Sequence, residues 1–189
     1  SKDVEFEWTI GPIPKEELPK NRITKEVITR YSTSIKSQST FYTDANGRQL
    51  MKRTRNSHPS FTYENTEPVA ANYYPITSNV LISDASSEFS IVTDRSQGAS
   101  SPVDGTVDVM LHRRSFNDDH WGVEEALDEP GNDGKGLIVT GVHTIQLGAL
   151  KGASLRHRRG QHDQFHPPTF TVAPLKDGLT PIKYAQAFK

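Results

Sequence analysis

Alternation of apolar and polar side chains at the start of this chain constrains its fold more than any other feature. Residues 4–10, VEFEWTI, place apolar side chains at every second position. A period of two is typical of a β-strand with one buried face. Gly11-Pro12 then ends the run, because both residues interrupt regular strand geometry. Since this strand starts almost at the first residue, we expect the chain to be a piece of a longer polypeptide.

Further strand patterns follow, separated by clusters of Asp, Ser, Gly and Pro. Strands are predicted at residues 25–31, 41–43, 49–54, 73–83, 88–93, 106–113 and 137–147. Asn46-Gly47 favours a primed hairpin turn. Short helices are predicted only at 122–127 and 181–188, and irregular surface loops at 127–136 and 154–168. The spacing predicts an all-β fold, part of a large antiparallel β-sandwich.

Composition excludes several classes of function. The 189 residues can form one sizeable core, and 22 Lys+Arg against 23 Asp+Glu give a net charge of -1. This balance argues against a nucleic-acid partner. No apolar run approaches the roughly 20 residues that cross a bilayer, so no membrane partner is expected. Cysteine is absent, which excludes disulfides and thiolate metal sites within the chain.

Asp118 and Asp119 are a candidate catalytic pair, because glycoside hydrolysis uses two carboxyl groups about 5 Å or roughly 6.5 to 9.5 Å apart. Neighbouring side chains of a strand point to opposite faces, which is the wrong geometry for such a pair. We therefore interpret the pair as capping a turn or holding a nearby Arg.

Three histidines with an aspartate form the other candidate group: His157, His162, His166 and Asp163. These side chains are suitable zinc ligands, but their spacing matches no metal motif. The neighbouring arginines at 156, 158 and 159 disfavour another cation. The segment is therefore predicted to be a solvated loop with no metal.

Two arginines end the predicted strand 106–113. Strand alternation would place Arg113 in the row of Val107 and Val109, and Arg114 in the opposite row. An Arg at the rim of a sheet can bind a carboxylate with two hydrogen bonds, or can simply lie in solvent. Tyr73-Tyr74 has a similar pair of interpretations, a sugar platform or a packed corner, and packing is favoured.

Several sequence segments, which we call words, resemble segments of one protein family and occur in the same order along the chain. They are VEFEWTIGPIP, KEVITRY, FYTDANGRQLMKR, TEPVAANYYPI, DRSQGASS and VDVMLHRR followed by NDD, over residues 3–147. Together they resemble the C-terminal β-region of glycoside hydrolase family 38, the class II α-mannosidases. DRSQG and HRR are most similar to the lysosomal or vacuolar acid type. The chain departs from the family in carrying His120-Trp121 where members have an Arg after the acidic pair.

The resemblance implies a galactose-mutarotase-like supersandwich that supports a retaining, zinc-dependent exo-α-mannosidase acting on N-glycan oligosaccharides. Its catalytic carboxylates and zinc ligands would lie on an N-terminal α/β domain, followed by a helical bundle, outside residues 1–189. On this chain the resemblance implies no catalytic or metal-binding residue, and a substrate contact by Arg113 or Arg114. The implied location is the lysosome or vacuole, with an extracellular location open. The alternative is a free-standing carbohydrate-binding or interaction β-sandwich without catalysis.

Overall fold

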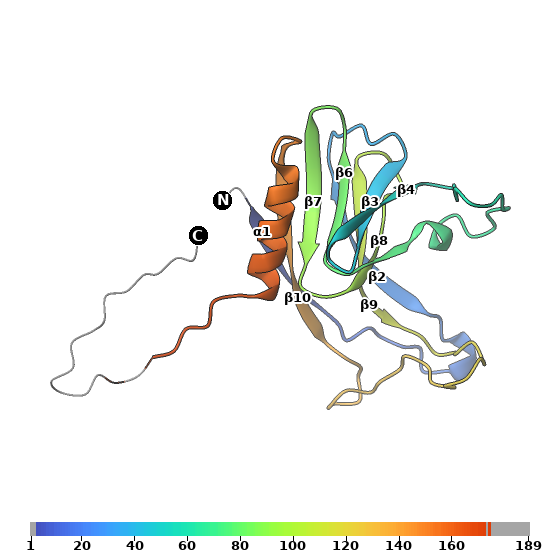
Figure 1. Ribbon diagram of the computed structural model, residues 1–189. Coiled ribbons are helices and arrows are strands. Elements are labelled where there is room, and N and C mark those ends of the chain that lie inside the picture. The colour runs from blue at the N-terminus through green and yellow to red at the C-terminus, as the bar shows by residue number, and fades with distance from the viewer. Residues whose placement is uncertain (1–2, 173, 175–189) are drawn as a thin grey trace.

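The chain folds into two antiparallel sheets with one α-helix beside them, in a computed structural model that describes residues 3–172 and 174 (Figure 1). The six-stranded sheet runs in the order β1 (Val4–Ile10), β10 (Val139–Ala149), β7 (Ser87–Thr93), β6 (Asn79–Ser83), β3 (Thr40–Ala45) and β4 (Gln49–Thr54). The four-stranded sheet runs in the order β2 (Lys25–Ser32), β9 (Thr106–Arg114), β8 (Gln97–Ser100) and β5 (Tyr74–Ile76). Two 3-10 turns, η1 (Pro19–Asn21) and η2 (Ala70–Asn72), lie in loops. The predicted all-β antiparallel sandwich is confirmed.

The core lies between the two sheets. The central strands contribute alternate residues, so that Phe89 and Ile91 of β7 face the same core as Val107 and Val109 of β9. The other buried residues of this core are Ile35, Phe41, Ile76, Val80, Ile82 and Ala99. This burial of apolar surface is the main term that holds the two sheets together.

Most predicted strands form where the sequence placed them, and residues 4–10 and 49–54 match β1 and β4 without shift. Asn46 and Gly47 both have positive φ, 56° and 64°, as a primed turn requires. Residues 73–83 do not form one strand. They split because the Asp44 carboxylate accepts hydrogen bonds from the backbone N–H groups of Thr77, Ser78 and Asn79, at 2.8, 3.0 and 3.0 Å. This corner sends β5 and β6 into different sheets.

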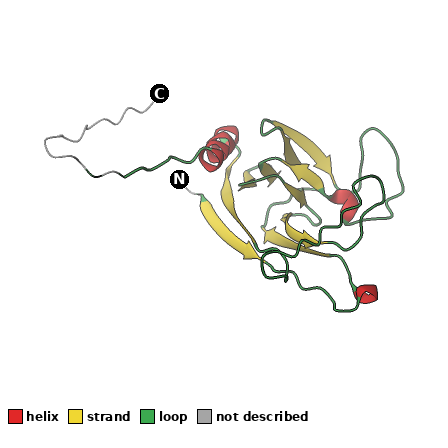
Figure 2. Cartoon of the chain, turned by 90° about the horizontal axis from the view of Figure 1, so that it is seen from below, coloured by secondary structure: helices red, strands yellow, loops and turns green. Residues whose placement is uncertain are grey.

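The largest difference from the sequence prediction is α1 (Ala153–Phe165), because a solvated loop at 154–168 was expected and is wrong. The helix covers the outer face of the six-stranded sheet beside β7 and β10 (Figures 1 and 2). At Gly160 a Cβ atom would lie 2.6 Å from Nε2 of Gln146, so the glycine permits close approach of the helix. Gln146 in turn donates to the backbone carbonyl of Arg156 at 3.3 Å.

The predicted helix at 122–127 is also wrong. This segment has no regular structure, and His120 and Glu124 have positive φ values of 59° and 55°, which interrupt a right-handed helix. The helix predicted at 181–188 lies outside the described residues. Among the described residues, no helix is long and apolar enough to span a membrane.

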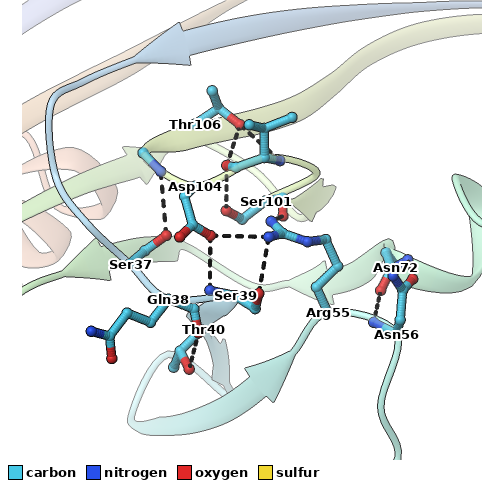
Figure 3. A network of polar contacts seen from close by, with 12 residues as sticks. Ser37, Gln38, Ser39, Thr40, Arg55, Asn56, Asn72, Ser101, Asp104 and Thr106 are labelled. Atoms are coloured by element: carbon cyan, nitrogen blue, oxygen red, sulfur yellow. Dashed lines mark hydrogen bonds and ion pairs between the residues drawn. The ribbon is translucent and has the colours of Figure 1, made fainter.

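Arg55 ties three loops together at one end of the sandwich (Figure 3). Its guanidinium donates to the Ser101 carbonyl at 2.9 Å, to Ser39 Oγ at 3.0 Å and to the Asp104 carboxylate at 3.0 Å. Close by, Asn72 of the NYYP word donates to Asn56 Oδ1 at 2.7 Å. The polar residues at this end of the sandwich therefore order the loops.

Candidate functional site

Two of the sequence words, DRSQGASS and LHRR, lie side by side in the fold. They meet because β8 pairs with β9, which places Ala99 opposite Val109. Next to this pairing is an open groove of about 420 Å³. Its lining residues are Glu26, Arg95, Ser96, Gln97, Gly98, Met110, Leu111, His112, Arg113, Leu127, Glu129, Leu137 and Val139.

A β-bulge in β9 decides which arginine faces this groove. Ile28 lies opposite Met110 and Val27 lies opposite His112, so Leu111 has no partner on β2. The extra residue reverses the alternation beyond it. Arg114 therefore continues the row of Val107 and Val109, and the prediction that Arg113 ends that row is wrong.

Of the two neighbouring arginines, Arg113 is the one that lines the groove. Its side chain is 57% exposed, and Nη1 lies 3.6 Å from Oε1 of Glu26 on the neighbouring strand. An exposed pair at this distance contributes little to stability, about 0 to 1 kcal/mol. The guanidinium thus keeps donors for a molecule in the groove.

Arg114 is held within the chain. Its side chain is only 5% exposed, and Nε donates to the Asp128 carboxylate at 2.6 Å. Nη1 donates to the backbone carbonyls of Ile13 at 2.6 Å and Lys135 at 2.8 Å. Arg114 thereby fastens the 127–136 loop, which supplies Leu127 and Glu129 to the groove.

The loop is built around this arginine. Burial alone would raise the pKa of Asp128, but hydrogen bonds from Arg114 and Lys15 outweigh it and hold the pKa below its ordinary value. Gly136 has φ +121°, and a Cβ there would lie 2.9 Å from Nη1 of Arg114. Glycine is thus required both by the backbone and by the space that the guanidinium occupies.

The DRSQG word forms the opposite side of the groove. Arg95 makes two hydrogen bonds to Asp94, at 3.0 and 2.8 Å, and its guanidinium lies 5.4 Å above the ring of Trp8. Asp94 also accepts from the backbone N–H of Val142 at 3.1 Å. Burial alone would raise the pKa of Asp94, but its bond to Arg95 lowers the pKa overall. The Asp94–Arg95 pair thereby attaches the turn that follows β7 to strand β10.

Gln97 joins the groove to a polar chain inside the sandwich. Its Nε2 donates to the Met110 carbonyl at 2.6 Å, and its Oε1 lies 2.9 Å from Nε2 of His143. The other ring nitrogen of His143 lies 2.9 Å from the Tyr31 hydroxyl. Burial is the main reason that the pKa of His143 falls to about 4, so the ring is neutral at pH 7. The sequence reasoning missed His143, although its position inside a strand of apolar neighbours is a signal of burial.

Asp118 and Asp119 lie in an exposed loop, where each accepts a backbone hydrogen bond from two residues ahead. The donors are the N–H groups of His120, at 3.2 Å, and Trp121, at 3.1 Å. This is the turn-capping alternative that the sequence predicted.

The histidine group is divided by α1. His157 faces the sheet, where Nε2 lies 2.5 Å from Oε1 of Glu88, and both side chains are buried. His162 is exposed and lies 3.8 Å from Asp163. Over residues 3–172 and 174, no group of three or more His, Cys, Asp or Glu side chains could hold a metal ion.

The tyrosines of the NYYP word pack at the corner between the sheets. Tyr74 contacts Phe41 edge to face, with ring centroids 5.8 Å apart, and lies under the Arg53 guanidinium at 4.3 Å. The Tyr73 hydroxyl donates to the buried Asp108 carboxylate at 3.3 Å. Burial is the main reason that the pKa of Tyr73 rises to about 12. Both residues follow the packing interpretation.

The groove combines an apolar floor with charged rims. Met110, Leu111 and Leu137 supply apolar surface, while Arg113 and the carboxylate of Glu129 supply hydrogen-bonding groups. A sugar ring presents the same two kinds of surface, C–H groups on its faces and hydroxyls at its edge. The groove therefore offers apolar contact and hydrogen-bonding groups to a small polar molecule.

Comparison with solved structures concerns the fold. The fold resembles an α-mannosidase of Enterococcus faecalis V583, with a TM-score of 0.57 and 16% identity over 87% of this chain and 16% of that one. At this identity the likeness concerns the fold alone.

The sequence defines the family. Residues 1–121 match the glycosyl hydrolases family 38 C-terminal domain, so the chain belongs to glycosyl hydrolase family 38. It is 40% identical to the lysosomal alpha-mannosidase of Cavia porcellus, over 92% of this chain and 16% of the relative. It is 41% identical to an alpha-mannosidase of Canavalia ensiformis, over 87% of this chain and 17% of the relative. The chain thus spans about a sixth of the length of these relatives.

Proposed function

We propose that this chain is the C-terminal β-sandwich part of an exo-α-mannosidase that removes terminal α-mannose from N-glycan oligosaccharides. Family membership and relatives named as alpha-mannosidases support the proposal. The observation that carries the role of this chain is the groove, where Arg113 lines the wall with an exposed guanidinium. The sandwich supports the catalytic domain and lends this guanidinium to the bound sugar.

The two arginines have different roles in this proposal. Arg113 contacts substrate hydroxyls from the rim of β9. Arg114 acts through the loop that it fastens, because its guanidinium is buried and donates to Asp128 and to two backbone carbonyls. Arg113 is thus the substrate-binding residue and Arg114 positions one wall of the groove.

The chemistry itself belongs to the rest of the enzyme. A retaining glycosidase uses one carboxylate as nucleophile and a second carboxyl group as acid and then base. Zinc is part of the proposed whole enzyme, but the described residues of this chain offer no set of ligands for it. We place the carboxyl pair and the zinc ligands on an N-terminal α/β domain and helical bundle, which are the proposed partners. The lysosome or vacuole is the proposed location, after the lysosomal relative.

Steady-state kinetics of the whole enzyme test the role of Arg113. Lysine keeps the charge but loses the planar pair of donors, so Arg113→Lys is expected to lower kcat/KM for a mannoside by about 10- to 100-fold. Arg159→Lys, on the exposed side of α1, is the matched control and should be unchanged. Normal kcat/KM in the Arg113 variant would sink the proposal.

Binding measurements separate the alternative, a free-standing carbohydrate-binding sandwich. Residues 1–189 alone are expected to show no mannoside binding, since the sugar is held mainly by the catalytic domain. Saturable binding of mannosides by residues 1–189, with no hydrolysis by the longer protein, would favour the binding module instead.

A further inference from the structure

The β1 side of the sandwich is unfinished in the part of the chain that the structure describes. β1 is the last strand of the six-stranded sheet, and only one of its edges pairs, with β10. Figure 2 shows it at the margin of the sandwich, next to the N-terminus. Its other edge carries backbone N–H and C=O groups that a further strand can bind.

An apolar patch lies on the inner face beside this edge. Val4 is 53% exposed, Phe6 48% and Leu147 58%, and we call these three residues the β1 patch. Pairing of Val4 with Ile145 and of Leu147 with Phe89 places them on the face that elsewhere forms the core. Adjacent large apolar side chains on an inner face mark a contact surface rather than scattered exposure.

The β1 patch is exposed because the four-stranded sheet ends at β2 and has no further strand opposite β1. Phe6 contacts Tyr31 of the edge strand β2 edge to face, with ring centroids 6.0 Å apart. The four-stranded sheet has β2 as its last strand on this side. In the described part of the chain, Val4 and Leu147 each keep more than half of their surface exposed.

We propose that a β-segment of the same polypeptide, outside residues 1–189, pairs with the free edge of β1 and covers the β1 patch. This rests on the proposed function only in requiring a longer polypeptide, and the relatives are about six times the length of this chain. A strand from the same chain needs no separate association step, and it satisfies the backbone groups of β1 along the whole strand.

The outward row of β1 specifies the chemistry of that segment. Glu5 and Glu7 are exposed on the face opposite Phe6. Cross-strand pairs of opposite charge are favoured and like charges are not. The partner strand therefore alternates apolar residues, facing the β1 patch, with Lys or Arg facing Glu5 and Glu7.

Photo-crosslinking in the whole enzyme tests this directly. Phe6 is replaced by benzoylphenylalanine, and equal amounts of ¹⁴N- and ¹⁵N-labelled enzyme are mixed before irradiation. The expected products join position 6 to a peptide outside residues 1–189, in pairs of a single isotope. Mixed-isotope pairs would assign the patch to a second copy, and the absence of crosslinks would leave it in solvent. Either result overturns the proposal.

Val69, which is 69% exposed in the loop before η2, is the control position for the same photo-reactive residue. Identical crosslinked peptides from both positions would show nonspecific contact and overturn the proposal. Hydrogen exchange of the unaltered enzyme gives an independent readout. All amides of residues 4–10 are expected to be protected, whereas rapid exchange at alternate amides is the behaviour of a free edge. Neither readout depends on mannosidase activity.

Discussion

Arg113 and Arg114 are neighbours of identical type whose truncations should destabilise the protein to very different extents. Arg114→Ala removes a guanidinium that donates to Asp128 and to the carbonyls of Ile13 and Lys135. Breaking a buried ion pair from one side costs about 3 to 5 kcal/mol. Because Asp128 is 22% exposed and keeps Lys15 at 3.1 Å, we expect the lower end, about 3 kcal/mol. Arg113→Ala, which loses an exposed pair, should cost less than about 1 kcal/mol.

The assay is native-state hydrogen exchange of the whole enzyme at increasing urea, read on peptides covering residues 127–137. This measures the local free energy of opening and avoids treating a multidomain enzyme as two-state. A loss confined to the Arg114 variant is expected. Equal losses in both variants, or none in the Arg114 variant, would refute the division of roles between the two side chains.

Two further changes test the supports of the groove. Gly136→Ala should destabilise the 127–136 loop by about 1 to 3 kcal/mol through backbone strain and contact with Arg114, measured by the same native-state hydrogen exchange. Gly134→Ala, with φ +76° and nothing within 4 Å, should lose only the free energy of backbone strain, and equal losses would contradict the contact. Burial lowers the pKa of His143 to about 4 from an ordinary 6.5, so the unfolded chain takes up a proton first as pH falls, and the stability present above pH 6.5 is lost toward pH 4. This loss is about 3 kcal/mol and should be absent in His143→Gln, measured as the free energy of opening of β10 by native-state hydrogen exchange at each pH. The same pH dependence in both proteins would show that His143 is not its source.

Most strands could be predicted because their patterns are continuous in the sequence, but the short β8, Gln97–Ser100, was not predicted. α1 could not, since the residues that it buries are Ala153, His157 and Gly160. These side chains are small or polar and leave no apolar stripe for a periodicity to reveal. What holds the helix is polar contact, such as that of His157 with Glu88 of β7.

The candidate site was predicted only in part, for geometrical reasons. The sequence indicated both arginines, but a single unpaired residue, Leu111, exchanges their faces. Arg114 finds its partners 14 to 101 positions away along the chain, at separations that no local pattern encodes. The contact between Gln97 and His143 is likewise not encoded locally, because β8 and β10 lie in different sheets.

A crystal structure of the whole enzyme with a bound mannoside inhibitor tests the central claim most directly. The measured quantity is the distance from the Arg113 guanidinium to the nearest sugar hydroxyl. The account predicts a hydrogen bond, with a separation of about 3 Å, while Arg114 keeps its bond to Asp128. A sugar bound out of reach of Arg113, or held by Arg114 instead, would contradict it.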